Sequence, residues 1–162
     1  MSTRSNTHFN NGESVHANIY RHSDGYPEGH GKDLVEFLKE LKTTLEDPRL
    51  DDPSYLAAKL VVRLANKSQE YGKKESPYDF LGVGVYMEDA GDIEYLYTVD
   101  CADINPFNGL PRVICQAVTQ SSRTDDPPTF REVKIPGYTP GSKAKRIRMP
   151  SKARRADLVF GA

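Results

Sequence analysis

The chain has 162 residues, a length typical of one domain that can bury a core without disulfides or a metal. Its hydrophobic fraction of 37%, with nine Tyr, six Phe and no Trp, is below the globular average but well above that of disordered chains. The apolar runs are too short to span a bilayer, and no apolar stretch follows the basic start as it would in a secretory signal. We therefore expect a folded, cytoplasmic protein that is not integral to a membrane.

Charge is divided unevenly along the chain. The formal net charge is −1, from 22 Lys and Arg against 23 Asp and Glu. Residues 1–132 hold 14 of the bases and 22 of the acids, which gives that part a charge of −8. Eight bases and no acid lie between Val133 and Ala156. Such asymmetry is typical of an acidic body that carries a basic interaction tail.

The predicted elements begin with a β-hairpin. Residues 3–9 and 14–20 flank an Asn-Asn-Gly-Glu turn, in which Asn-Gly tolerates the positive φ that a tight turn needs. Apolar and polar residues alternate in the second strand, so we expect one face on the core and one polar face. His8 and His16 fall on either side of the turn and could face each other, as solvated histidines rather than metal ligands.

Two amphipathic helices are predicted to follow. Apolar residues recur at helical spacing over residues 32–46, and Pro48 ends the run. The second helix has Asp52 as its N-cap and Pro53 in its first turn, and it is expected to end at Tyr71, one residue before a glycine. Each helix thus presents an apolar face that must be buried.

The second half of the chain reads as β-structure. Residues 81–87 and 93–100 are predicted strands joined by an acidic turn, and residues 112–119 are a third candidate. A short edge strand is expected over residues 130–135. The order of hairpin, two helices, hairpin and further strand predicts an α+β fold, with a mainly antiparallel sheet and the helices on one face.

The domain division follows this pattern. We expect an α+β body over residues 1–120, a linker that can add an edge strand over 121–135, and a basic tail over 136–162. The tail has no sustained apolar period, so we expect it to be irregular and dispensable for folding.

The cysteine pattern predicts no metal site and no cofactor. Cys101 and Cys115 lack the paired short spacings of a zinc site. We expect two reduced thiols, half-buried in strands, and a disulfide between them is the alternative.

Three tyrosines in the predicted strands have two interpretations. Tyr86, Tyr95 and Tyr97 could form a stacking platform for nucleic-acid bases. Tyr95 and Tyr97, however, share a strand face with Ile93 and Val99, and this alternation favours packing in the core.

The most unusual segment spans residues 20–31, with the sequence Tyr-Arg-His-Ser-Asp-Gly-Tyr-Pro-Glu-Gly-His-Gly, and is called loop 20–31 below. One interpretation is catalytic or metallic, because His22, Asp24, Glu28 and His30 supply two imidazoles and two carboxylates. Their spacing, however, matches no compact metal motif.

Two further interpretations of loop 20–31 remain open. Free amides at the start of the following helix could bind an anion with help from Arg21, Gly29, Gly31 and Lys32, although the spacing is not that of a Walker loop. Alternatively, the segment is a structural turn, in which glycines and Pro27 set the backbone path and the histidines satisfy local carbonyls.

This loop, the opening Met-Ser-Thr-Arg, the helix start at residues 52–59 and the strand start at residues 91–95 together carry a family resemblance. They resemble a family of small uncharacterised proteins from phages and other prokaryotic mobile elements. The resemblance covers roughly residues 1–100, and it implies a compact accessory protein without supplying catalytic residues.

The basic tail has the charge density to contact phosphates, but it could equally be solvated or pair with the acidic body. Its candidate contact residues are Lys143, Lys145, Arg146, Arg148, Lys152, Arg154 and Arg155. The leading functional hypothesis is therefore a phage-like accessory protein that binds a host protein or a nucleic acid, without catalysis. The alternative is a small metal-assisted or acid-base hydrolase, acting on a phosphoester and centred on the His22–His30 stretch.

Overall fold

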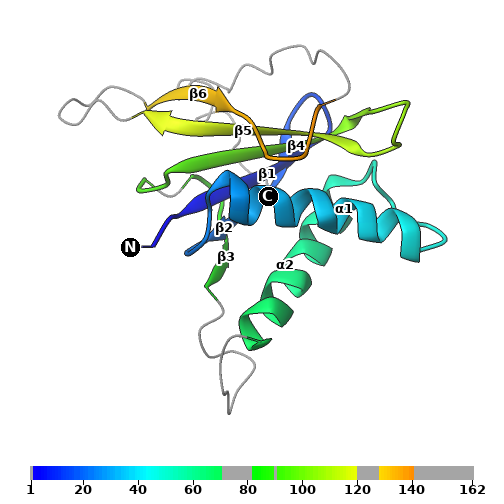
Figure 1. Cartoon of the computed structure of the whole chain (residues 1–162), viewed down its shortest axis with the longest axis horizontal. Helices are drawn as coiled ribbons and strands as arrows, with labels where there is room; N and C mark the ends of the chain where they lie inside the picture. The colour runs from blue at the N-terminus through cyan, green and yellow to red at the C-terminus, as the bar shows by residue number, and fades with distance from the viewer. Residues whose placement is uncertain (1, 71–81, 90, 120–127, 141–162) are drawn as a thin grey trace, which may run out of the picture.

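The computed structural model describes residues 2–70, 82–89, 91–119 and 128–140. Within these ranges six strands form one mixed sheet in the order β3-β2-β1-β4-β5-β6, and the helices α1 and α2 pack against one of its faces (Figure 1). All neighbouring strands are antiparallel except β1 and β4. The α+β class with a mostly antiparallel sheet is as predicted. The sheet face that carries the helices is called the helix face, and the other the open face.

The first hairpin forms where the sequence predicts it. Strand β1 (Ser5–Asn10) pairs with β2 (Val15–Arg21) around a turn in which Gly12 has a φ of 88°. The side-chain oxygen of Asn11 accepts hydrogen bonds from two amides of the turn, which fixes its shape.

The helices also agree with the sequence pattern, with one addition. Helix α1 (Lys32–Thr44) continues from a π-helical turn, η1 (Pro27–Gly31), so helical structure begins five residues earlier than the pattern indicates. Helix α2 (Pro53–Glu70) is capped by Asp52, whose carboxylate accepts from the amides two and three residues further on, at 3.1 and 3.2 Å. Its predicted end at Tyr71 lies outside the described residues. Neither helix, as far as the structure describes them, has the length and apolar character that crossing a membrane requires.

The expected second hairpin does not form. Strand β3 (Val83–Val85) pairs with β2 at the edge of the sheet, whereas β4 (Tyr95–Ile104) lies beside β1 in parallel. The physical reason is burial: most of β4 is buried on both faces, which suits the centre of a sheet, while β3 is short and has a glycine at its middle.

The sheet continues beyond β4 with two further strands. Strand β5 (Pro111–Thr119) pairs with β4, and β6 (Thr129–Val133) forms the edge that the sequence predicts. The chain after β6 stays on the body: Ile135 is buried, and the Tyr138 hydroxyl accepts a hydrogen bond from the Val113 amide at 3.0 Å. The predicted boundary of the tail at residue 136 is therefore too early. Residues 141–162, with all seven candidate tail contacts, lie outside the described residues.

The core fills the space between the helices and the helix face. Its fully buried large side chains include Phe9, Leu34, Leu38, Leu56, Leu60, Tyr97 and Val99. Cys101 and Cys115 lie in the same cluster as free thiols, and burial raises their pKa values to about 12 and about 11. The cysteines are thus free thiols in strands, but they are buried rather than half-buried as predicted. Of the two tyrosines assigned to the core, Tyr97 is fully buried, whereas Tyr95 is half-buried and packs against the core.

We expect Leu38→Ala and Leu60→Ala each to lower the free energy of unfolding by about 2–5 kcal/mol, because each leaves a cavity between helix and sheet. Val62→Ala is the matched control, since Val62 lies on α2 with 60% of its surface exposed. Urea denaturation monitored by circular dichroism measures all three. A loss below ~0.5 kcal/mol in either leucine variant would contradict the packing described here.

Candidate functional site

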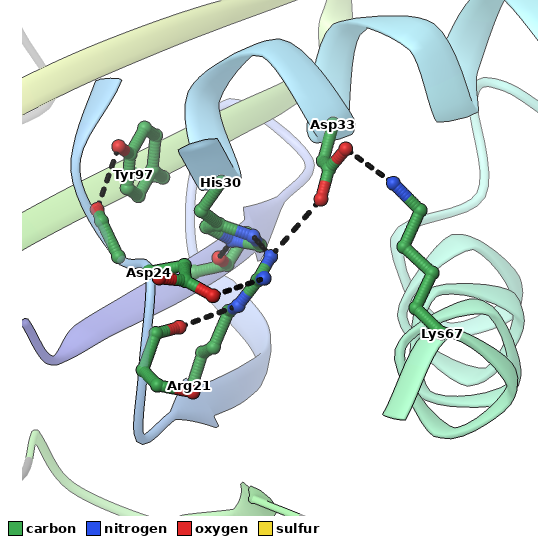
Figure 2. A network of polar contacts seen from close by, with 9 residues as sticks. Arg21, Asp24, His30, Asp33, Lys67 and Tyr97 are labelled. Carbon is green, nitrogen blue, oxygen red and sulfur yellow. Dashed lines mark hydrogen bonds and ion pairs between the residues drawn. The ribbon is translucent and has the colours of Figure 1, made fainter. Parts of the chain in front are cut away.

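Loop 20–31 is organised around the guanidinium group of Arg21, as Figure 2 shows. Its Nε donates to the carbonyl of Ser23 at 2.7 Å, and one terminal nitrogen reaches His30 Nδ1 at 3.1 Å and Asp33 Oδ2 at 3.3 Å. The other terminal nitrogen lies 3.9 Å from the carboxylate of Asp24. Arg21 therefore joins the end of β2 to the loop and to the first turn of α1.

His30 is the buried end of this network. Its Nε2 lies 2.7 Å from the Thr7 hydroxyl on β1, and its ring meets Tyr97 edge to face with the centroids 4.9 Å apart. Because a guanidinium can only donate, His30 Nδ1 must accept from Arg21, and Nε2 carries the proton toward Thr7. Burial, aided by the charge of Arg21, lowers the pKa of His30 to about 3. The imidazole is thus neutral at physiological pH, with both nitrogens in use.

Asp33 links the network to the second helix. Its carboxylate pairs with Arg21 through one oxygen and with Lys67 of α2 through the other (Figure 2). Burial raises the pKa of Asp33, but the hydrogen bonds and charges of Lys67 and Arg21 outweigh it and hold the pKa below its ordinary value. These contacts hold α1, α2 and β2 together through one chain of charges.

The backbone of loop 20–31 lies tightly against the sheet. A Cβ on Gly25 would come within 2.8 Å of the Ser5 side chain, and the Gly25 carbonyl accepts a hydrogen bond from the Tyr97 hydroxyl at 2.8 Å. A Cβ on Gly29 would meet the Asp24 carbonyl at 2.6 Å. Close approach of the backbone therefore explains both glycines: Gly25 lies against the sheet, whereas Gly29 lies against the loop's own backbone.

The four residues of the catalytic interpretation do not come together. His22 lies on the open face, where its Nδ1 is 3.0 Å from the hydroxyl of Tyr20, whereas His30 points into the helix face. Asp24 contacts Arg21, and Glu28 is exposed. Within the described ranges no three His, Cys, Asp or Glu side chains gather as they would around a metal ion. The separation of the two imidazoles by the sheet leaves no shared centre for acid-base chemistry.

The anion-binding interpretation requires free amides, and the loop uses them internally. The amides of Gly29 and Gly31 donate to the Tyr26 carbonyl, at 3.0 and 3.4 Å, and the amide of His30 donates to the Asp24 carbonyl at 2.9 Å. The amide of Lys32 donates back into η1. Since Arg21 is held by two carboxylates, this set offers no open cradle for a phosphate.

A second polar cluster lies on the open face and was missed by sequence reasoning. One carboxylate oxygen of Asp89 lies 2.5 Å from His8 Nε2 and accepts from the amide groups of Asn6 and Asn18 at 2.9 and 3.0 Å. Burial raises the pKa of Asp89, but the hydrogen bonds, led by that from His8, hold it below its ordinary value. The cluster pins the segment after β3 onto the sheet.

This arrangement corrects the expectation for His8. His8 is buried rather than solvated, and it lies opposite Asn18, not His16, in the hairpin register. No local signal could have indicated its partner, because Asp89 is 81 residues away in the sequence. His16 is exposed and lines a shallow depression of about 560 Å³ formed with the α1–α2 connection.

The two most exposed of the large apolar side chains that the structure describes lie on segments held by hydrogen bonds. Phe107, in the β4–β5 loop, has 93% of its surface exposed. Its amide donates to the side chain of Asn105 at 2.8 Å, the Asn105 amide donates to the Leu110 carbonyl at 2.9 Å, and Lys42 of α1 donates to the loop at Asn108. The available signal was an aromatic residue in a turn rich in Asn, Pro and Gly, where a side chain has no core to enter.

Met87 is the second exposed side chain, also with 93% of its surface accessible. Both of its neighbours are fixed: the Tyr86 amide donates to the Asn18 carbonyl at 3.0 Å, and the Glu88 carbonyl accepts from the Asn18 side chain at 3.1 Å. Tyr86 itself packs edge to face on Tyr20, with ring centroids 5.2 Å apart. Tyr86 therefore joins Tyr20 on the open face and is separated from Tyr97 in the core.

We expect the free energy of unfolding to fall less steeply with decreasing pH in the His30→Gln variant than in the wild type. The unfolded imidazole takes up a proton below its ordinary pKa of about 6.5, whereas the folded one resists protonation down to about 3. Its contribution to stability is therefore complete above pH 6.5 and is lost as the pH falls toward 3, by on the order of 1 kcal/mol per pH unit. Glutamine keeps a donor and an acceptor but does not titrate.

Urea denaturation at pH 4, 5, 6 and 7 compares this variant with the wild type, and His22→Gln, outside the network, serves as the matched control. In the control, the free energy of unfolding should depend on pH as it does in the wild type. An equal pH dependence of the unfolding free energy in the wild type and in His30→Gln would show that the imidazole of His30 is not held neutral.

No family model, no curated protein and no solved structure matches this chain. The functional proposal therefore rests on the contacts and surfaces of the chain itself.

Proposed function

We propose that this chain is a cytoplasmic, phage-like accessory protein that acts by binding a host protein, without catalysis. The observation that carries the proposal is a contrast between the loop and the surface. Arg21 and His30, the central groups of loop 20–31, have their partners within the fold. Phe107 and Met87, in contrast, expose nearly all of their apolar surface on segments that the fold holds in place.

Exposed apolar side chains on a backbone that the fold holds in place are suited to partner binding. A backbone segment that is already positioned has less conformational freedom to lose on association, so more of the burial energy of its side chains appears as affinity. Large anchors of this kind, surrounded by polar groups, commonly supply most of the binding energy at protein interfaces. Phe107 has polar neighbours in Asn105 and Asn108, and Met87 lies beside Glu88.

The hydrolase alternative has less support. It needs a shared centre for His22, Asp24, Glu28 and His30, but the two imidazoles lie on opposite faces of the sheet. His30 has a lowered pKa of about 3 and no solvent exposure that would admit a substrate. His30 instead contributes to folding, because it joins Thr7 of β1 and Arg21 of β2 to the turn that precedes α1.

We expect affinity capture from a bacterial extract to enrich one host protein in a manner that depends on the two anchors. The enriched protein is identified by mass spectrometry, purified, and its binding to the chain remeasured by calorimetry. Phe107→Ser or Met87→Ser should weaken that binding by about tenfold or more, which corresponds to at least 1.4 kcal/mol. Val62→Ser is the matched control, because it removes an exposed apolar side chain of α2 and should leave the affinity unchanged. Equal binding by all four proteins, or no protein that rebinds after purification, would contradict the proposal.

Nucleic-acid contact through the tail is a second candidate function, and the charge distribution favours it. The bases between Val133 and Ala156 have no acid among them, so they can displace counterions along a phosphate backbone. In residues 1–132 the 14 bases are outnumbered by 22 acids, and residues 82–111 contain no Lys or Arg.

We expect any affinity for nucleic acid to reside in residues 141–162 and to fall steeply with salt. Fluorescence anisotropy with a labelled single-stranded DNA and a duplex, at 50 and 200 mM salt, compares the full chain with a chain ending at Pro140. The shortened chain keeps Tyr138, which bonds to β5, and a thermal melt checks that it still unfolds cooperatively. If the shortened chain binds as tightly as the full chain, the tail is not the contact.

A further inference from the structure

Strand β3 presents an unused backbone edge. It is the outermost strand on its side of the sheet in the part of the chain that the structure describes. The Tyr86 amide donates to the Asn18 carbonyl of β2, and the Gly82 carbonyl accepts from the amide of His22, the residue that follows β2, at 2.8 Å. Because successive residues of a strand direct their backbone groups to opposite sides, the donors and acceptors of Val83 and Val85 point away from β2. They are positioned to pair with one more strand.

The side chains along this edge offer two different surfaces. Val85 lies opposite the core residue Ile19 on the helix face, yet 73% of its surface is exposed. On the open face the Tyr86 ring lies across Gly84, where a Cβ would come within 2.6 Å of the ring, and it packs on Tyr20. An added strand would therefore meet an apolar side chain on one face and an aromatic pair on the other.

Three acids lie beside this edge: Glu88, Asp89 and Asp92. The carboxylate of Asp89 accepts from the side chain of Asn18, whose carbonyl in turn accepts from the Tyr86 amide. Glu88 follows the strand directly, and Asp92 lies close enough to raise the pKa of Tyr20, after the larger effect of burial, while Arg4 pairs with Asp92. The negative charge beside the aromatic pair favours a cationic side chain over the Tyr86 ring.

We propose that this edge binds an extended, Lys- and Arg-rich segment of the partner protein as an added strand next to β3. The inference rests on the proposed function, since it names the surface and the chemistry of the protein that is bound. The backbone of Val83 and Val85 supplies the hydrogen bonds of the added strand. Alternate residues of the segment direct apolar side chains to Val85 and basic ones to Tyr86 and Tyr20. This arrangement selects for sequences in which basic and β-branched residues alternate.

The probe is a fluorescein-labelled peptide, acetyl-Lys-Val-Arg-Val-Lys-Val-Arg-amide, with acetyl-Glu-Val-Glu-Val-Glu-Val-Glu-amide as its acidic counterpart. Anisotropy titrations use the full-length chain at 50 and 150 mM salt. The basic peptide should bind and the acidic one should not, and higher salt should weaken but not abolish binding. Absence of binding by the basic peptide at either salt concentration would overturn the proposal.

The decisive variant is Val85→Pro, which removes the outward-facing N–H and leaves the pairing with β2 intact, as proline is tolerated on an edge strand. Val85→Pro should lower the affinity for the basic peptide by about tenfold. Val85→Thr, which keeps the N–H, should have an affinity within about twofold of that of the wild type. A thermal melt establishes that both variants are folded. Equal affinity for the proline and threonine variants would show that the peptide is attracted by charge alone, and would overturn strand addition.

Three further outcomes distinguish the chain's own tail from a partner segment, and the inference from the proposed function. If a full-length variant with the seven tail bases changed to Gln binds the peptide and the wild type does not, the chain's own tail occupies the edge and a partner segment does not. If the peptide fails but capture of a host protein still depends on Phe107, the edge is wrong while protein binding stands. If both fail, the proposed function fails with the inference.

Discussion

The hydrogen bond from Arg21 to the buried imidazole of His30 is the contact on which the arrangement of loop 20–31 depends. A polar ring taken out of water costs free energy unless its nitrogens find partners, and here Arg21 and Thr7 supply both. The guanidinium in turn needs counter-charges at this depth, which Asp33 and, at longer range, Asp24 provide. Helices α1 and α2, strands β1 and β2 and the loop are thus fixed relative to one another by one connected set of polar contacts.

The polar groups of loop 20–31 that a ligand would need already have partners. The amides of Gly29, His30 and Gly31 and the imidazole of His30 are hydrogen-bonded within the fold, and Gly25 allows the backbone to approach the sheet. Surfaces that the fold leaves unsatisfied lie elsewhere: the apolar side chains of Met87 and Phe107, and the outer edge of β3. The Asp89 cluster links the buried polar contacts to the exposed surface. Its hydrogen bonds with side chains of β1 and β2 hold the segment that carries Met87 in position.

Much of the fold could be predicted because its signals are local. The Asn-Gly turn sets the first hairpin, and the Asp52 cap with apolar periodicity sets the second helix. The parallel pairing of β1 with β4 could not be predicted, because it joins segments 90 residues apart, as in the Ser5 to Tyr95 pair, and no turn specifies it. Composition likewise placed His22 and His30 in one candidate site, although His22 contacts Tyr20 on the open face and His30, in η1, contacts Thr7 on the helix face.

The protonation state of His30 tests the structural role of the loop most directly. Long-range proton–nitrogen correlation spectra of histidine-labelled protein report the state of each ring nitrogen between pH 4 and 8. The structure predicts that His30 remains neutral throughout, with the proton on Nε2 and none on Nδ1. Titration of His30 near the ordinary histidine pKa of about 6.5, or a proton on Nδ1, would contradict the network and return the loop to consideration as an acid-base site.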